Sequence, residues 1–388
     1  MGLFLAAALV VLTQDTGPQI AIAVTRDGAR VEAVSPQVGD LTLETPLGRL
    51  LTARDPVVEV VDGAAQLEAM RGLRADGTLD DVALLRDLST AGQLSAMLAL
   101  AEELHARDPG MLLPYEVLES WAARVDPVPR SVDRNDRVAW LWMRVKKADW
   151  PEAVVAGWRL LEEVSAGSNV SNDRILLLSD LRDGLDDRRP WVRRAAARVA
   201  GRQQEVGMRE RILPLSLEDP NPASRDGAAW GAREIHPWGA RQYWARNVLR
   251  NVGGLRESAA LNLGRYGGDE GARVLIHVLA AWDKRPPARF DFAGRRIWVV
   301  QEAERDAHRL ASPSMADPRQ DPHFPATPHS DLEREYIDLG TYVKVTRYGE
   351  SLRVALLEAL DLYAGQNTGR DAEAWLRWYL EERPADTP

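Results

Sequence analysis

At 388 residues, of which 45% are hydrophobic, the chain is long enough for two or three domains with a substantial core, which excludes a disordered tail. Its net charge of -9 at pH 7 argues against a protein that is drawn onto nucleic acid or an anionic membrane, so we expect no nucleic-acid partner. The absence of cysteine excludes disulfides, thiolate metal sites and cysteine nucleophiles.

The first thirteen residues, MGLFLAAALVVLT, form a continuous apolar run. This run is too short to cross a bilayer as a helix, so no transmembrane segment is predicted, and it is typical of a signal-peptide core. We interpret residues 1–18 as a signal peptide or apolar N-terminal segment. The protein is then exported, periplasmic or envelope-associated; the alternative is a cytoplasmic protein in which the run is a buried first strand or helix.

Residues 19–62 carry short apolar alternations separated by turns that contain glycine and proline. Alternation with a period of two is typical of strands, and it occurs in IAIAVT, ARVEAV, DLTLET, GRLLTA and VVEVV. RDG and PLG supply the turn residues between segments. The sequence therefore predicts a small antiparallel β meander.

From residue 63 to residue 173 the apolar spacing changes to three and four, which predicts helical hairpins. The clearest segments are DDVALLRDL, QLSAMLALAEELHAR and PEAVVAGWRLLEEV. Gly110 is well placed to stop the second of these helices. RVDPVPR at 124–130 is interpreted as a turn.

A pattern of the form D-x-x-P-x-x-R-x-x-A-A recurs within residues 174–283. Two complete copies lie 32 residues apart, and a third, offset by a further 31 residues, has Arg250 and Gly253 in place of the aspartate and the proline. Such a period indicates a solenoid, in which each unit buries its face against its neighbours. The positions are Asp187, Pro190, Arg193, Ala196 and Ala197; Asp219, Pro222, Arg225, Ala228 and Ala229; and Arg256, Ala259 and Ala260.

The residue types of the pattern agree with helices that stack. Proline is favoured at the first helical position, where an N–H has no intrahelical partner, and Asn221 is suited to cap the helix that Pro222 begins. In the first copy Val192 and Val199 lie on one apolar stripe. The small alanines let neighbouring helices approach closely.

At these positions the chain resembles the HEAT-like repeat proteins, including the bacterial group labelled with the phycobilisome lyase repeat. The resemblance implies a structural ladder in which turn aspartates and helix arginines pair with neighbouring repeats. It places Asp187 with Arg193 and Asp219 with Arg225, with Arg256 in the third copy, where Arg250 interrupts the ladder. Some members of this group attach a bilin to a partner protein. The lyase label of the group is attached to the repeat pattern, however, and not to any chemistry of these residues.

Residues 284–350 interrupt the period, with two extended segments, RFDFAGRRIWVVQE and YIDLGTYVKVTRY, around a loop at 311–331 rich in proline and histidine. The loop holds His323 and His329, but their spacing fixes no geometry, so we assign no metal site. Residues 351–388 are expected to form a further repeat helix and a capping helix. The fold class expected is mainly α: a HEAT-like α-solenoid of helical hairpins, preceded by a small antiparallel β module and interrupted by a β-hairpin and loop insertion near 284–350.

Aromatic residues and arginines alternate in two candidate surfaces for a ligand or partner. The segment AAWGAREIHPWGARQYWAR supplies Trp238, Arg241 and Trp244, which suit stacking and cation–π contact with a peptide or glycan, or else packing between helices. In the first repeat helix, Trp191, Arg194 and Arg198 do not recur in the other copies. A specific contact made by that helix is therefore expected from them.

No G-x-S-x-G, H-E-x-x-H, Walker A or G-x-G-x-x-G motif occurs, and GDEGAR at 268–273 is interpreted as a turn. We therefore assign no catalytic residue and no cofactor. The function expected is a noncatalytic scaffold or adaptor that binds an unidentified protein partner. A glycan- or peptide-binding envelope protein is the first alternative, and a bilin-lyase-like enzyme is the second.

Overall fold

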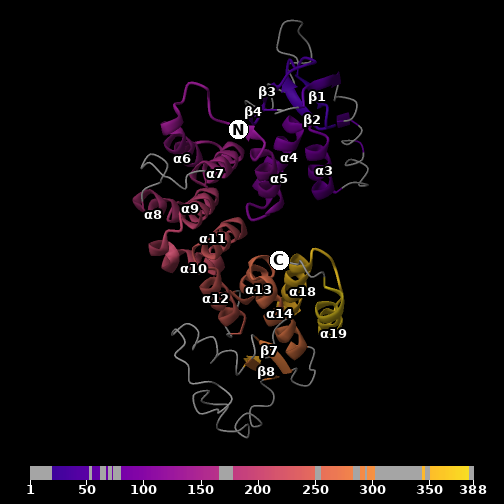
Figure 1. The fold of residues 1–388 in the computed structure, drawn as a ribbon, viewed down its shortest axis with the longest axis vertical. Helices are drawn as coiled ribbons and strands as arrows, with labels where there is room; N and C mark the ends of the chain where they lie inside the picture. Colours follow the sequence, from indigo (N-terminus) through magenta and orange to yellow (C-terminus); the bar gives the residue numbers. More distant parts are fainter. Residues whose placement is uncertain are drawn as a thin grey trace. The chain divides into compact units, whose positions relative to one another are not determined.

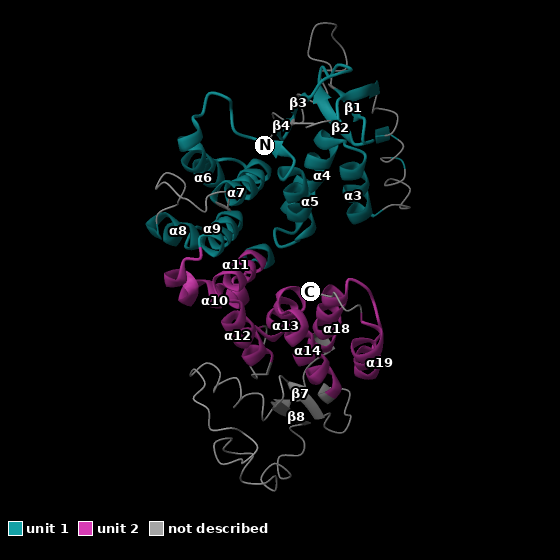
Figure 2. Ribbon diagram, viewed as in Figure 1, with its two compact units in different colours: residues 1–203, 221–224 teal, residues 204–220, 225–388 magenta. Residues whose placement is uncertain are grey.

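The computed structural model describes residues 20–51, 55–61, 67–68, 72, 80–165, 178–249, 255–282, 289–292, 295–301, 343–345 and 350–383. These residues are mainly helical, with small antiparallel sheets near the N-terminus, as the sequence predicts (Figure 1). The chain divides into two compact units: residues 1–203 with 221–224, and residues 204–220 with 225–388 (Figure 2). Within the ranges given above, no helix has both the length and the apolar character that a membrane span requires.

The described part of unit 1 begins with two three-stranded antiparallel sheets. One has the strand order β2-β1-β5 and the other β3-β4-β6. The antiparallel module is thus confirmed, but it is not a single meander, because β5 returns to β1 and the β3–β4 hairpin joins a separate sheet. The strands are β1 Ile20–Thr25, β2 Arg30–Val34, β3 Thr42–Thr45, β4 Gly48–Leu51, β5 Val57–Val61 and β6 Val125–Asp126.

Strand β6 corrects the turn predicted at 124–130. Val125 pairs with Leu50 of β4, and both side chains are buried. The neighbouring Asp126 carboxylate accepts a hydrogen bond from Arg49 at 3.1 Å and one from Arg137 at 3.0 Å. A two-residue strand is too short to show alternation, and its partner lies far away in the sequence, so local pattern does not reveal it.

The helices of unit 1 follow the sheets in a series of hairpins. Glu32 of β2 caps α4, because its carboxylate accepts from the Ser95 backbone N–H at 2.8 Å and also from the Ser95 hydroxyl. At Gly92, just before α4, φ is +71°, and a side chain there would collide with the Arg30 carbonyl. The helices are α3 Asp81–Thr90, α4 Leu94–Arg107, α5 Leu113–Ala122, η1 Arg134–Asp136, α6 Arg137–Lys147, α7 Trp150–Ser165, α8 Leu178–Leu185 and α9 Pro190–Arg202.

Unit 2 is built from helices, with a small group of strands between α14 and α18. Helices α13 and α18 pack so closely that a methyl group on Gly264 would collide with the Ala359 carbonyl oxygen. Its helical elements are η3 Val206–Met208, α10 Arg209–Glu218, α11 Pro222–Ile235, α12 Pro237–Leu249, α13 Leu255–Tyr266, α14 Gly268–Trp282, α18 Glu350–Ala364, α19 Ala372–Arg377 and the π-helical turn η6 Trp378–Glu382. The first turn of α11, residues 221–224, is grouped with unit 1.

Two copies of the sequence pattern share the same local structure. Helices α9 and α11 begin at Pro190 and Pro222, as predicted. In each helix the pattern arginine donates to the backbone carbonyl of the pattern aspartate: Arg193 Nη1 to Asp187 at 2.8 Å, and Arg225 Nη1 to Asp219 at 2.6 Å. These bonds lie within one copy and use the main chain. The side-chain ladder between neighbouring copies therefore stays a prediction.

The caps and alanines of the pattern also have clear roles. The Asn221 side chain accepts from the N–H groups of Ala223 at 2.9 Å and Ser224 at 3.1 Å, as expected of a cap. The alanine pairs of all three copies are buried, and Arg256 of the third copy is buried with them. The positions of Arg250 and Gly253 lie outside the described residues.

The insertion contains strands where two extended segments are predicted. Strands β7 (Arg289–Phe292) and β8 (Arg295–Gln301) pair as an antiparallel hairpin, and β9 (Val343–Val345) pairs in parallel with β8. The segment at 268–273 is not a turn, because it forms the start of α14. Both the N-terminal apolar run and the loop at 311–331 lie outside the described residues.

Candidate partner-binding pocket

The first candidate surface is instead part of the interior of unit 1. Arg194 is only 4% exposed, which closes it to a partner, and the Arg198 side chain is 12% exposed and largely covered. Trp191 is half-buried and packs against the core of the unit. The reason is a partner that the repeat pattern does not reveal: both arginines point to Glu119 on α5.

Glu119 is the centre of a buried ion cluster. Its carboxylate accepts from Arg194 Nε at 3.0 Å, from Arg194 Nη2 at 3.3 Å and from Arg198 Nη1 at 2.8 Å. Burial by itself raises the pKa of Glu119, but the two guanidinium charges and their hydrogen bonds outweigh it, so the pKa lies below its usual value. Arg194 Nη1 also donates to the Ala223 carbonyl at 2.8 Å, which ties α5, α9 and the first turn of α11 together.

Aromatic rings from four helices pack together beside this cluster, where the Arg194 guanidinium lies 5.4 Å from the centre of the Tyr115 ring. His105 of α4 stacks on Trp150 of α7 with centroids 4.0 Å apart and planes 4° apart, while Tyr115 of α5 meets both rings edge-on. Trp191 of α9 lies edge-on to His105 at 6.1 Å. Burial lowers the pKa of His105 to about 4 and raises that of Tyr115 to about 12. Near pH 7 both rings are neutral, as expected of packed core residues.

The second candidate surface separates into a core residue and two pocket residues. Trp244 is fully buried, and its indole N–H donates to the Ser216 hydroxyl at 3.0 Å, so it packs between helices. Trp238 and Arg241 remain partly exposed and line a pocket of unit 2. The sequence left ligand contact and helix packing open for this segment. Trp244 belongs to the helix packing, whereas ligand contact of Trp238 and Arg241 stays a prediction.

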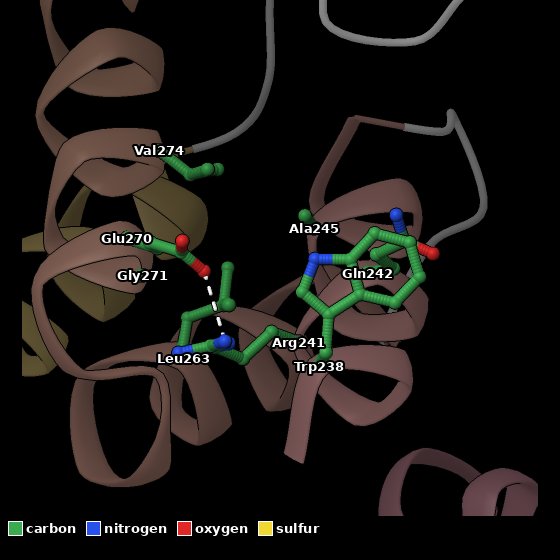
Figure 3. Close-up of a pocket in the computed structure, with 8 residues that line it drawn as sticks. All are labelled: Trp238, Arg241, Gln242, Ala245, Leu263, Glu270, Gly271 and Val274. Carbon is green, nitrogen blue, oxygen red and sulfur yellow. Dashed lines mark ion pairs between the residues drawn. The ribbon is translucent and has the colours of Figure 1, made fainter. Parts of the chain in front are cut away.

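Three helices form this pocket, which we call the α12–α14 pocket. One face of α12 contributes Trp238, Arg241, Gln242 and Ala245, whose spacing of three and four places them side by side. Helix α13 contributes Leu263, and α14 contributes Glu270, Gly271 and Val274. Figure 3 shows Arg241 of α12 reaching across to Glu270 of α14.

An ion pair and an apolar wall give the α12–α14 pocket its chemistry. Arg241 Nη2 lies 3.0 Å from a Glu270 carboxylate oxygen, and both side chains are partly open to solvent (Figure 3). Ala245, Leu263 and Val274 form the apolar lining. The enclosed space of the pocket is about 10 Å³, room for a single water molecule and far below the roughly 300–1,000 Å³ of a typical small-molecule site. The pocket is therefore a shallow depression in the surface.

Gln242, Glu270 and Val274 are pocket residues that the sequence reasoning did not select. The spacing from Trp238 along one helix face was a usable signal for Gln242, whereas Glu270 lies in the segment interpreted as a turn. Across the described ranges, no group of three or more histidine, aspartate or glutamate side chains is arranged to hold a metal ion. Comparison with known proteins finds no match to this chain among family models, curated proteins or solved structures.

Proposed function

We propose that the protein is a noncatalytic scaffold or adaptor that binds a protein partner, with HEAT-like helical repeats as its framework. The α12–α14 pocket carries this proposal, because it combines a partly exposed tryptophan, an arginine and an apolar wall. Tryptophan and arginine are the residue types that dominate the binding energy of protein interfaces.

The repeat framework has its own support. The same arginine-to-carbonyl bond occurs at the start of α9 and of α11, at positions 32 residues apart in the sequence. Each bond holds the turn before a helix, and each helix buries an alanine pair. Such regularity favours repeated helical hairpins, which present extended surfaces to partners.

Affinity capture with matched variants tests the proposed function. The full chain, Trp238→Ala and the control Arg377→Ala would be used as bait in extracts of native cells. Arg377 is exposed in unit 2 and does not line the pocket. We expect one stoichiometric protein with the wild type and the control, and its loss with Trp238→Ala at unchanged helicity. Equal recovery with all three, or no stoichiometric protein, contradicts the proposal.

Peptide or glycan binding is the second candidate, and the partly exposed ring of Trp238 favours it. Tryptophan fluorescence would be measured while peptide and glycan panels are added. A shift that disappears in Trp238→Ala supports this candidate, and a silent response to both panels rejects it. Trp244→Ala is not a suitable binding variant, because Trp244 is a core residue.

We also propose that the chain is exported, on the basis of the apolar run in residues 1–18. The first thirty residues fused to an export-dependent reporter provide the test. Reporter activity is expected outside the cytoplasm. A reporter that remains inactive assigns the protein to the cytoplasm.

A further inference from the structure

We propose that the chain self-associates head to tail, with a basic and aromatic face of α6 in one copy against an acidic and aliphatic face of α18 in a second copy. The α6 face consists of Trp140, Met143, Lys146 and Lys147, and the α18 face of Val354, Leu357, Glu358, Asp361 and Leu362. Neither face includes a residue of the α12–α14 pocket, so this inference goes beyond the proposed function and is tested separately from it.

The α6 face is the side of that helix that unit 1 leaves open. Trp140, Met143 and Lys147 follow one another at spacings of three and four, which places them side by side on the helix. Met143 is 42% exposed, Lys147 is exposed and Trp140 is partly exposed. The residues that α6 buries on its other side are Val138, Leu141, Trp142 and Val145.

The α6 face carries positive charge without a partner. Arg144, at the edge of this face, pairs with Glu152. Within the described part of the chain, however, neither the Lys146 nor the Lys147 ammonium group forms an ion pair. The face therefore offers two uncompensated positive charges beside the exposed thioether of Met143 and the ring of Trp140.

The α18 face has the same design with the opposite charge. Val354, Glu358 and Leu362 follow one another at spacings of four, with Leu357 and Asp361 beside them. Val354 is 56% exposed and Leu362 is 39% exposed, which is unusual for side chains of this type on a helix that also has a buried side. The residues that α18 buries are Leu352, Ala355, Leu356, Ala359 and Leu360.

The negative charges of the α18 face also lack partners. Glu358 is exposed, Asp361 is partly exposed, and neither forms an ion pair among the residues that the structure describes. Burial raises the pKa of Asp361, and no neighbouring positive charge opposes this rise. A cation that lies against this face in a complex would supply the missing partner.

A second copy of the chain fits both faces at once. Burial of the exposed apolar side chains of α6 against those of α18 is favourable, and the opposite charges select which surfaces meet. Because the two faces differ, each copy in a pair keeps one α6 face or one α18 face open. The contact is therefore heterologous, and it repeats into a closed ring or an open chain of copies.

Sedimentation equilibrium of the full chain tests this inference. Concentrations up to about 0.5 mM are needed, because two helix faces form less than a standard interface. We expect the average mass to rise with concentration. Glu358→Lys changes the net charge from -9 to -7, which weakens the general repulsion between copies. It nevertheless places like charges opposite each other at the contact, so association is expected to weaken by about tenfold or more.

Charge exchange between the faces gives the sharper result. Lys147→Glu alone is also expected to prevent association, whereas a mixture of Lys147→Glu and Glu358→Lys chains is expected to associate, because opposite charges then meet at every contact. Arg86→Glu and Glu381→Lys are the matched controls. Both positions are exposed and lie outside the two faces, so these variants make the same charge changes and are expected to associate as the wild type does.

An apolar variant tests the other half of the contact. Val354→Ser removes an exposed aliphatic group from the α18 face and is expected to weaken association by roughly fivefold. Val206→Ser is its control, because Val206 is 69% exposed but lies in η3, outside both faces. Both changes are at exposed positions, and circular dichroism verifies that the variants keep the helicity of the wild type.

The outcomes decide the inference in both directions. Association that is lost in each single charge variant and restored in their mixture supports it. A chain that stays monomeric at every concentration overturns it, whether or not the faces then bind another protein. Association that Glu358→Lys leaves unchanged or strengthens, or a mixture that stays monomeric, also overturns it. Capture of a partner that depends on Trp238 is unaffected by any of these results.

Discussion

Replacing Glu119 by glutamine is expected to destabilise unit 1 far more than a surface change of the same type. The substitution removes the carboxylate that accepts three hydrogen bonds, two from the buried Arg194 and one from Arg198, whose side chain is 12% exposed. Breaking a buried ion pair by removing one partner costs about 3–5 kcal/mol. Glutamine retains one acceptor oxygen, so we expect a loss of about 3 kcal/mol, the lower end of that range.

Glu152→Gln is the matched control. Glu152 pairs with Arg144 on the surface of the same unit, with both side chains about half exposed. Exposed pairs contribute about 0–1 kcal/mol, so this variant is expected to differ little from the wild type. Both variants replace a glutamate by a glutamine, so the difference between their losses of stability reports the effect of burial.

Hydrogen exchange measured by mass spectrometry near neutral pH is the assay. It reports the opening free energy of peptides from α5 and α9 separately from those of unit 2, which a single global unfolding curve does not resolve for a protein of two units. Faster exchange of α5 and α9 in Glu119→Gln alone is expected. Equal lowering of the opening free energy of these helices by both variants would refute a stabilising role of the buried Glu119 cluster.

The pH dependence of the same cluster has a definite sign. The folded-state pKa of Glu119 lies below its ordinary value of 4.5, so its stabilising effect is fully present above pH 4.5. The effect is lost as the pH falls below that value and the carboxylate becomes protonated. Wild-type unit 1 should lose stability in this acidic range, and Glu119→Gln should show a smaller loss there.

Three further predictions concern the interior. Burial lowers the pKa of His105 from 6.5 to about 4, so the stability of the fold falls as the pH falls through this interval. In His105→Phe the thermal midpoint is therefore expected to depend less on pH between these values. An unchanged pH dependence of the midpoint would show that His105 does not control it. Gly264→Ala forces a methyl group onto the Ala359 carbonyl, so it is expected to lower the free energy of unfolding, measured with denaturant, by more than about 1–3 kcal/mol. An unchanged free energy of unfolding would contradict the close packing of α13 on α18. Trp244→Phe removes the hydrogen bond to Ser216 and leaves a gap, so it is expected to lower the free energy of unfolding by about 2–3 kcal/mol in the same assay. The folded variant is expected to bind peptide as the wild type does. A binding defect without loss of stability would show that Trp244 belongs to the binding site.

Features encoded by neighbouring residues were predictable from the sequence. Pro190 and Pro222 fix helix starts locally, and Asn221 beside Pro222 forms the expected cap. Features that depend on distant partners were not. Arg193 and Arg194 are adjacent in the sequence, yet one bonds to the turn before its own helix and the other to Glu119, 75 residues away.

The same limit applies to the candidate pocket. Trp238 and Arg241 were selectable by residue type, but Trp244 was selected on the same grounds and is a core residue. Glu270 was missed because the glycines around it suggested a turn, whereas they lie at the start of α14. Which aromatic or charged side chain faces outward depends on how helices pack, and a single sequence does not record that arrangement.

The pairing of β4 with β6 also constrains the order in which unit 1 is completed. N-terminal segments generally fold first as a chain is synthesised. Here β3 and β4 are made early, but the third strand of their sheet is residues 125 and 126, which are made only after α3, α4 and α5. The edge of β4 that pairs with β6 therefore stays unpaired until three helices have been synthesised. The sheet is completed only after this helical part of the chain has been made.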